Sequence, residues 1–304
     1  MARVALLGLG ALGAANLVQM LDHNPAADVV VVAGGSRGER LRRDGIVAND
    51  RHYGVTVADP AAAGPVDLVL VAVKSYQLDA AIADLAGCVG PGTAIVSLLN
   101  GTTSERRLQA AFPAAFVPLA ISMGSNCGRD ATGFRFYSVG RLFVGEPRND
   151  PPSARVTALS ALLDEFGVVH TVPADMEHQL WKKFVLNCGV NQATALLEAP
   201  YRAIQAPDSA ARGLMVGLLR EALAAGQARG VDLTEADLTS ILEILDALDP
   251  AGYSSMAQDA INHRPMETDE FAGEVVRLGE AHGVPTPLSA AAATILQAKE
   301  ETWA

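Results

Sequence analysis

The 304-residue sequence has few of the residues that mark several common protein classes. Only 5% of the residues are aromatic and 19% are charged, while half are hydrophobic, so the core must be built mainly from Ala, Val and Leu. The three cysteines, Cys88, Cys127 and Cys188, form no Cys-x-x-Cys or Cys/His cluster. This odd and scattered set argues against a disulfide framework or a metal site and is typical of a reducing compartment.

Basic residues and long apolar runs are also scarce. The chain has 23 Lys and Arg against 34 Asp and Glu, a formal net charge of −11. Nucleic acids and anionic membrane surfaces both reward a basic face, so this balance argues against either as a partner. No charged segment followed by an apolar run opens the chain, and no uninterrupted apolar run is long enough to span a bilayer. We therefore expect a cytoplasmic protein, and the sequence leaves open whether it forms a homodimer.

Short apolar runs separated by helical patterns fill the first half of the chain. The runs occupy residues 3–8, 28–33, 67–73, 93–99 and 116–121. Continuous apolar runs, rather than alternating ones, are typical of a parallel sheet covered on both faces. The helical patterns between them, for example at 11–21 and 77–86, indicate βαβ units. Residues 124–145 are rich in Gly, Ser and Thr, and there we expect antiparallel strands at one edge.

A glycine pattern follows the first apolar run directly and opens a helical pattern, fitting Gly-x-Gly-x-x-Gly. In this context the first glycine permits a tight turn and the second lets backbone N–H groups approach a pyrophosphate. The third glycine allows close contact between helix and strand. A glycine-rich turn without a ligand is the alternative. The expected dinucleotide-binding residues of this turn are Gly8, Leu9, Gly10, Ala11, Leu12 and Gly13.

The residues after the second apolar run bear on which dinucleotide is bound. A site for NAD usually places Asp or Glu there, whereas this chain reads Ala33-Gly34-Gly35-Ser36-Arg37. A hydroxyl and a guanidinium suit a 2′-phosphate, so we expect NADP(H) as the cofactor, with Ser36 and Arg37 in its site. A solvated loop arginine is the alternative interpretation of Arg37.

Two polar residues follow directly after later apolar runs. Lys74 comes after 67–73, and Asn100 comes after 93–99. Ligands of doubly wound sheets bind beyond the carboxyl ends of the strands, so both residues are candidates to contact cofactor or substrate. A solvated lysine and a turn-forming Asn-Gly pair are the alternatives.

After Pro173 the pattern becomes helical almost throughout. The expected helices cover residues 174–199, 207–230, 234–248, 254–263, 267–282 and 287–302. The expected fold class is α/β, with an N-terminal Rossmann-type doubly wound parallel sheet and a C-terminal all-α domain. We place the dinucleotide-binding domain at residues 1–172 and the helical domain for substrate binding and catalysis at 173–304.

The first of these helices carries the most informative pattern in the chain. Lys183, Asn187 and Asn191 recur every four residues, so they project from one side of a helix. Such a helix could line a cleft, with one proton donor and two amides directed at a small polar ligand. A half-buried helix whose amides bond to nearby backbone is the alternative.

Two residues further along could complete this site. The Ser255 hydroxyl could bind a carboxylate, or Ser254 or Ser255 could simply cap a helix. Glu267 lies just after a proline at an expected helix start. It could orient the ammonium of Lys183 and keep it protonated, or it could be an ordinary first-turn glutamate.

Several segments together carry a family resemblance. They are Gly8-x-Gly10-x-x-Gly13, Val73-Lys74, Leu98-Leu99-Asn100-Gly101, Gly145-Glu146, Leu180-Trp181-x-Lys183-x-x-x-Asn187-x-x-x-Asn191, Ala193-Thr194-Ala195, Ser254-Ser255-Met256-x-Gln258-Asp259, Arg264-Pro265-x-Glu267-x-Asp269 and His282-Gly283-Val284-Pro285-Thr286-Pro287. With these segments the chain resembles the ketopantoate reductase (2-dehydropantoate 2-reductase) family over nearly its whole length. The resemblance implies reduction of a 2-keto acid to its 2-hydroxy acid with NADPH, in pantothenate biosynthesis. It also implies an active site between a Rossmann-type domain and a helical domain.

The resemblance also implies roles for individual residues. Lys183 matches the general acid and Glu267 its acidic partner; Asn187, Asn191 and Ser255 match substrate-binding positions; Lys74 and Asn100 match positions near the nicotinamide and the substrate. The chain departs from the family pattern where Gly34-Gly35-Ser36 precede Arg37, and where Met266 and Thr268 flank the glutamate.

We therefore expect NADPH-dependent reduction of 2-dehydropantoate to pantoate, by hydride transfer with Lys183 as general acid and without a metal. One alternative is a reductase or D-2-hydroxyacid dehydrogenase acting on another small 2-keto acid. A non-catalytic NADP-sensing protein is a second. A phosphorylated-polyol dehydrogenase is less consistent with the sequence, because its helical half has no dense basic cluster.

Overall fold

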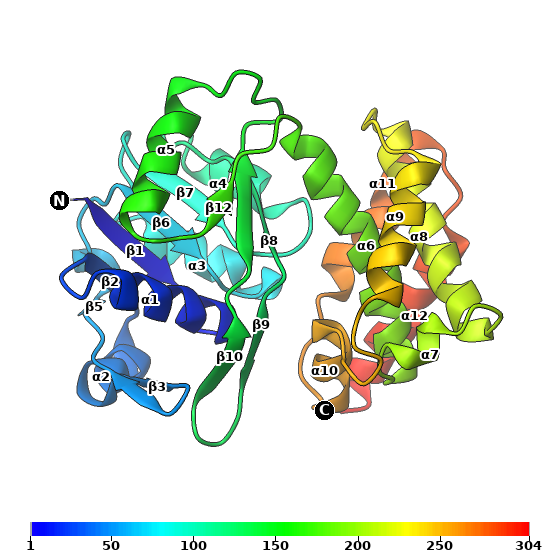
Figure 1. Ribbon diagram of the computed structural model, residues 1–304, viewed down its shortest axis with the longest axis horizontal. Coiled ribbons are helices and arrows are strands. Elements are labelled where there is room, and N and C mark those ends of the chain that lie inside the picture. Colours follow the sequence, from blue (N-terminus) through cyan, green and yellow to red (C-terminus); the bar gives the residue numbers. More distant parts are fainter. Residues whose placement is uncertain (1, 304) are drawn as a thin grey trace. The chain divides into compact units, whose positions relative to one another are not determined.

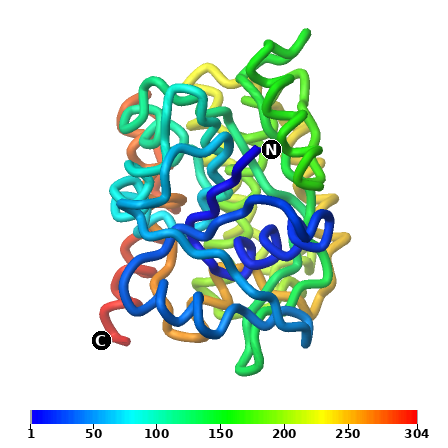
Figure 2. Tube along the Cα trace, turned by 90° about the vertical axis from the view of Figure 1, so that its left-hand side faces the viewer, coloured from blue at the N-terminus to red at the C-terminus, as the bar shows by residue number. Residues whose placement is uncertain are grey.

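The computed structural model describes residues 2–303, and its chain divides into two compact units. The first unit ends at Gln179 and the second begins at Leu180. The strands all lie in the first unit, and the yellow-to-red part of the chain is helical (Figures 1 and 2). The predicted combination of an α/β part and an all-α part is therefore confirmed.

A five-stranded parallel sheet forms the centre of the first unit. Its strands lie in the order β5 (Val57–Ala58), β2 (Asp28–Val32), β1 (Arg3–Leu7), β6 (Leu68–Val71) and β7 (Ala94–Ser97). The chain proceeds from β1 to one side through β2 and then crosses to the other side through β6. The strand order therefore reverses at β1, and this switch point is where doubly wound sheets bind their ligands.

Helices cover both faces of this sheet (Figure 1). On one face, the side chains of alternate β1 residues, Val4 and Leu6, belong to a core that includes α1 (Ala11–His23) and α5 (Ala154–Glu165). On the other face, Ala5 and Leu7 belong to a core with α3 (Leu78–Leu85) and α4 (Ser104–Ala111). Every position of such a strand faces apolar neighbours, which explains the continuous apolar runs in the sequence.

Two smaller sheets complete the first unit. One has the order β4 (Arg51–Tyr53), β3 (Ile46–Ala48), β10 (Phe134–Ser138) and β9 (Asn126–Arg129), and the other β12 (His170–Thr171), β11 (Arg141–Gly145) and β8 (Leu119–Met123). The antiparallel strands expected over residues 124–145 are confirmed in β9 and β10, which pair with each other, and in β11, which pairs with β8. Their expected place at one edge of the parallel sheet is wrong, because they belong to these two separate sheets.

The fifth predicted strand of the parallel sheet, at residues 116–121, is wrong. Phe116 makes only an isolated parallel bridge with Ala94, and the chain then pairs as β8 with β11 in the antiparallel sense. Pro118 lies between the bridge and β8 and has no N–H to donate, so the ladder with β7 cannot continue. The fifth strand of the parallel sheet is the two-residue β5, which lies beside β2, and β7 forms the other edge.

The second unit is helical, and the predicted helices are found with ends shifted by a few residues. They are α6 (Met176–Leu197), which begins at the end of the first unit, and α8 (Ala210–Ala228), α9 (Glu235–Asp246), α10 (Ser255–Ile261), α11 (Glu274–His282) and α12 (Pro287–Glu301). A short α7 (Arg202–Gln205) was not predicted, and the segment η3 (Asp269–Gly273), a π-helical turn, precedes α11. Gly189 of α6 lets this helix approach α8 closely, because a Cβ at Gly189 would lie 2.4 Å from the Leu219 side chain.

Candidate active site

The glycine turn after β1 is held by close backbone contacts. Gly8 has a φ of +98°, and a Cβ there would lie 2.5 Å from the carbonyl oxygen of Ala72. A Cβ at Gly13 would lie 2.0 Å from the carbonyl oxygen of Gly8. Both positions therefore need glycine for the fold itself, since any side chain would force the turn apart.

At Gly10, unlike Gly8 and Gly13, no close backbone contact requires a glycine. A Cβ there would have no neighbour nearer than the Ala72 oxygen at 3.9 Å, and its φ of −82° suits any residue. Gly10 is also the N-cap of α1, and no side chain caps this helix. Space and uncapped N–H groups thus coincide at the helix N-terminus beside the switch point, which fits the pyrophosphate of a dinucleotide.

Ser36 and Arg37 lie in the first turn of α2 (Gly35–Asp44), which starts shortly after β2. They are therefore helical rather than part of a loop. Protein around Arg37 lowers the pKa of its guanidinium by partial burial, and two neighbouring cations, Arg40 and Arg129, lower it further. Arg129, on β9, stacks its guanidinium 5.2 Å from the centroid of the Phe134 ring. The end of β2 thus carries three gathered guanidiniums, an arrangement that favours a phosphate ligand.

Sequence reasoning did not find Arg40 or Arg129. Arg129 lies on a hairpin far along the chain, so no local pattern links it to Arg37. Arg40 had a weak signal, because it is one turn after Arg37 in the same helical pattern.

Lys74 and Asn100 follow the neighbouring strands β6 and β7, as predicted. Lys74 has an extended backbone and its N–H donates to the Gln77 side chain at 3.2 Å, at the start of the short helix η2 (Ser75–Gln77). Asn100 is half-buried and precedes Gly101, which has a φ of +93°. Because β6 and β7 are parallel neighbours, both residues lie at the carboxyl edge of the sheet.

In the second unit, α6 presents the predicted row of polar groups. Lys183 is half-buried, while Asn187 and Asn191 are each only 6% exposed. The side-chain nitrogen of Asn187 is fully buried and has no hydrogen-bond partner within residues 2–303. The ammonium of the adjacent Lys182 lies 3.5 Å from the Asp237 carboxylate. The Asn187 nitrogen therefore does not make the bond to nearby backbone that the alternative interpretation would give it.

Ser255 and Glu267 lie elsewhere in the same unit. The capping role belongs to Ser254, whose hydroxyl accepts from the Ala257 N–H at 3.1 Å and bonds Thr194 at 2.7 Å. The Ser255 hydroxyl is exposed at the first residue of α10. Glu267 is 6% exposed and directly precedes Thr268 and the π-helical turn η3. π-helical turns are frequent at functional sites.

Thr268 is a further polar group that sequence reasoning left without a role. It is 4% exposed, and its hydroxyl has no hydrogen-bond partner within the described residues. The signal in the sequence was its place directly after Glu267, where the chain departs from the family pattern.

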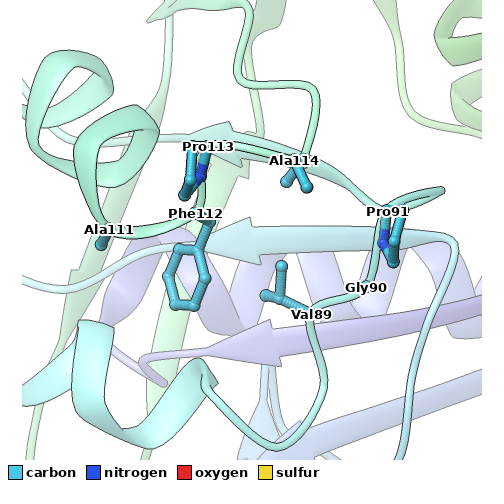
Figure 3. Close-up of a pocket in the computed structure, with 8 residues that line it drawn as sticks. Val89, Gly90, Pro91, Ala111, Phe112, Pro113 and Ala114 are labelled. Carbon is cyan, nitrogen blue, oxygen red and sulfur yellow. The ribbon is translucent and has the colours of Figure 1, made fainter.

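A separate apolar cavity lies at the opposite end of β7. Its volume is about 210 Å³, and Figure 3 shows the side chains of Val89 and Phe112 among those lining it. The lining residues come from segments that precede β7 and β8, and none of them is titratable. This cavity therefore lacks the acid–base groups that the predicted chemistry needs, and it is distinct from the candidate residues.

Two negative findings concern the described part of the chain. Residues 2–303 contain no cluster of three or more His, Cys, Asp or Glu able to hold a metal ion. Within the same residues, no helix combines the length and apolar character needed to cross a bilayer.

Comparison with known sequences identifies the family. The description "Ketopantoate reductase PanE/ApbA" matches residues 4–149, and "Ketopantoate reductase PanE/ApbA C terminal" matches residues 175–300. The 2-dehydropantoate 2-reductase of Caulobacter vibrioides is 32% identical over 306 residues, covering 98% of this chain and 99% of that protein. The chain belongs to the ketopantoate reductase family. It is therefore an oxidoreductase that acts on a CH–OH group, in a family of pyridine-nucleotide dehydrogenases.

Solved structures agree with this membership. The 2-dehydropantoate 2-reductase of Geobacter metallireducens superposes with a TM-score of 0.82 at 26% identity, covering 97% of this chain and 99% of that one. A D-mandelate dehydrogenase in a ternary structure with NADH and anilino(oxo)acetate gives a TM-score of 0.85 at 20% identity, with 99% of each chain covered. The second likeness shows that the ketopantoate reductase fold is shared with an enzyme of a different name.

Proposed function

We propose that this chain reduces 2-dehydropantoate to pantoate with NADPH, serving pantothenate biosynthesis. The observation that carries the proposal is the buried side-chain nitrogen of Asn187, one helical turn after Lys183, which has no hydrogen-bond partner within residues 2–303. Leaving a buried amide without a partner costs about 1–3 kcal/mol, so such a group is retained where a ligand completes it. A small keto acid with a carboxylate and hydroxyl oxygens offers the acceptors that this amide lacks.

We propose a division of labour along the chain. Residues 1–172 hold the dinucleotide through Gly8, Leu9, Gly10, Ala11, Leu12 and Gly13, and residues 173–304 supply substrate binding and catalysis. The separate family matches over 4–149 and 175–300 support this division.

Lys183 is the proposed proton donor. When bound, the cofactor supplies a hydride to the substrate carbonyl carbon. Negative charge then grows on the carbonyl oxygen, where the ammonium of Lys183 stabilises it and delivers a proton. Glu267 is the carboxylate that keeps Lys183 protonated and oriented, since a nearby negative charge favours the charged form of an amine.

The remaining candidate residues orient the substrate. Asn187, Asn191 and Ser255 offer hydrogen-bond donors to its carboxylate and hydroxyl oxygens, while Lys74 and Asn100 act from the carboxyl edge of the sheet. Fixing the reacting atoms in this way contributes to rate by removing rotational freedom before the chemical step.

NADP rather than NAD is the proposed cofactor because of the charge at the end of β2. Arg40 and Arg129 both act on Arg37 by like-charge repulsion, and a 2′-phosphate would relieve that repulsion. Ser36, in the same first turn of α2, adds a hydroxyl donor. A bound NAD has no 2′-phosphate and would leave this repulsion unrelieved.

Lys183→Ala tests the proposal, with Lys182→Ala as the matched control. Removing the proton donor should lower kcat with 2-dehydropantoate by roughly 10²- to 10⁴-fold while leaving the Kd for NADPH unchanged. Lys182→Ala removes a neighbouring ammonium that pairs with Asp237, so it should leave kcat near that of the wild type. Equal kcat values for the two variants would remove Lys183 from the chemistry.

A panel of 2-keto acids decides the substrate. Wild-type protein is assayed by NADPH oxidation with 2-dehydropantoate and with other branched and aromatic 2-keto acids. The highest kcat/KM is expected for 2-dehydropantoate; a higher value for another acid would reassign the chain to that substrate. Tight NADPH binding without reduction of any acid would indicate a non-catalytic sensor. Assembly as a homodimer and residence in the cytoplasm remain predictions, to be tested by light scattering and cell fractionation.

A further inference from the structure

An unusual run of buried polar residues surrounds the loop that carries Asn100. Ser97 ends β7 and is fully buried, while Ser104 and Glu105, at the start of α4, are 2% and 5% exposed. Burying a carboxylate and two hydroxyls in a sheet core is costly unless hydrogen bonds satisfy them. The arrangement therefore calls for a reason beyond packing.

These three side chains form a continuous hydrogen-bond chain. The Ser104 Oγ donates to the Glu105 Oε2 at 2.9 Å, and the Ser97 and Ser104 hydroxyls are 2.8 Å apart. The Ser97 Oγ accepts from the backbone N–H of Leu99 at 3.2 Å. Since each hydroxyl has one proton, and that of Ser104 is used on Glu105, Ser97 must be the donor to Ser104. All the bonds then run in one direction, from the backbone at Leu99 to the carboxylate.

The chain clamps the two ends of one loop. Ser97 lies at the end of β7 and Ser104 at the start of α4, and Asn100 lies in the loop that joins them. The clamped peptide N–H belongs to Leu99, the residue directly before Asn100. Gly101, directly after it, has a φ of +93° that a residue with a side chain rarely adopts. The backbone of Asn100 is thus fixed from both sides.

We propose that Glu105 is a positioning residue that sets the place of the Asn100 side chain through Ser104 and Ser97. This inference rests on the proposed function, in which Asn100 contacts the substrate or the nicotinamide half of the cofactor. Glu105 itself touches neither. Successive hydrogen bonds polarise one another, so an acceptor at the end of the chain stiffens the bond at Leu99.

A double-mutant cycle tests the proposal. Glu105→Ala should lower kcat/KM for the keto acid roughly 10- to 100-fold, because small displacements of a positioning group carry losses of this order. Glu105→Gln keeps an oxygen that accepts from Ser104 and should restore most of the activity. In an Asn100→Ala background, Glu105→Ala should cost nothing further, since its effect passes through Asn100. Additive losses in the cycle would overturn the proposal.

Thr93→Val is the matched control for stability. Thr93 precedes the same strand at its other end, is 2% exposed, and its hydroxyl donates to the Val66 oxygen at 2.6 Å and accepts from the Gly90 N–H at 2.9 Å. It should lower Tm about as much as Glu105→Ala while kcat/KM stays unchanged. An equal loss of kcat/KM in both variants would reduce Glu105 to a structural role. Should Glu105→Ala fail to fold, Ser104→Ala interrupts the same chain and replaces it in the cycle.

Ligand binding separates this inference from the proposed function. Glu105→Ala should raise the Kd for NADPH but leave the Kd for 2′,5′-ADP unchanged, because that ligand carries only the adenosine end and its 2′-phosphate. If the wild type reduces no 2-keto acid, the proposed function fails and the same cycle is measured on the Kd for NADPH. A loss of affinity for both ligands, or for neither, would overturn the positioning role.

Discussion

Replacing Asn187 by leucine should make the ligand-free protein no less stable while impairing its activity. The Asn187 amide is buried and its nitrogen has no partner within residues 2–303, a situation that costs about 1–3 kcal/mol. Leucine is of comparable length but larger, and crowding of a packed site returns roughly 1 kcal/mol or more of that gain. The net change in the free energy of unfolding is therefore expected between about 0 and 2 kcal/mol in favour of the variant.

The activity should move the other way. If the Asn187 amide donates to a carboxylate or to the developing oxyanion, its loss removes a charge-assisted hydrogen bond, which corresponds to about 10- to 100-fold in kcat/KM. Higher stability together with lower activity is the signature of a group kept for function rather than for folding.

The assay combines thermal unfolding without ligand and steady-state kinetics with 2-dehydropantoate. A gain of 1 kcal/mol raises Tm by roughly 2–8 °C in domains of ordinary size, which calorimetry resolves. Thr194→Val is the matched control on the same helix, because the buried Thr194 hydroxyl bonds the Val190 oxygen at 2.7 Å and the Ser254 hydroxyl at 2.7 Å. That variant should lose stability and keep its kcat/KM. A fall in the stability of Asn187→Leu by more than about 1 kcal/mol, with kcat/KM unchanged, would show that the amide serves the fold.

Three further outcomes are expected. Arg37→Ala should lower the kcat/KM for NADPH about 10- to 100-fold and leave that for NADH nearly unchanged, measured in parallel assays; equal losses would exclude a 2′-phosphate contact. Gly10→Ala should fold with a wild-type Tm but bind NADPH poorly. Gly13→Ala should fail to fold, because a Cβ at Gly13 would lie 2.0 Å from a carbonyl oxygen. Circular dichroism measures the folding of both variants, and cofactor titration measures their binding of NADPH. Burial raises the pKa of the Cys88 and Cys127 thiols to about 11, so at about pH 8 they carry roughly 100-fold less thiolate than an ordinary thiol. Iodoacetamide should therefore label them slowly until the protein is denatured. Rapid labelling of the native protein, followed by mass spectrometry, would contradict that burial.

The sequence alone determined the parts of this protein whose physics is local. A strand followed by Gly8, Gly10 and Gly13 predicts a turn and a helix N-terminus. Gly8 and Gly13 are required by close contacts with neighbouring backbone, and Gly10 leaves space at the helix N-terminus. The four-residue spacing of Lys183 and Asn187 likewise fixes which side of α6 they share, since helix geometry leaves no other choice.

Only the tertiary structure decided the features that join distant segments. It brought Arg129 near enough to Arg37 for their charges to interact, assigned the helix cap to Ser254 rather than Ser255, and left the Asn187 side-chain nitrogen without a partner within residues 2–303. It also turned the predicted fifth parallel strand into a bridge at Phe116 and an antiparallel strand. Each of these outcomes depends on which groups come into contact after the chain has folded. Whether a polar group finds a hydrogen-bond partner, or a charge lies near another, is set by these tertiary contacts and not by the local sequence.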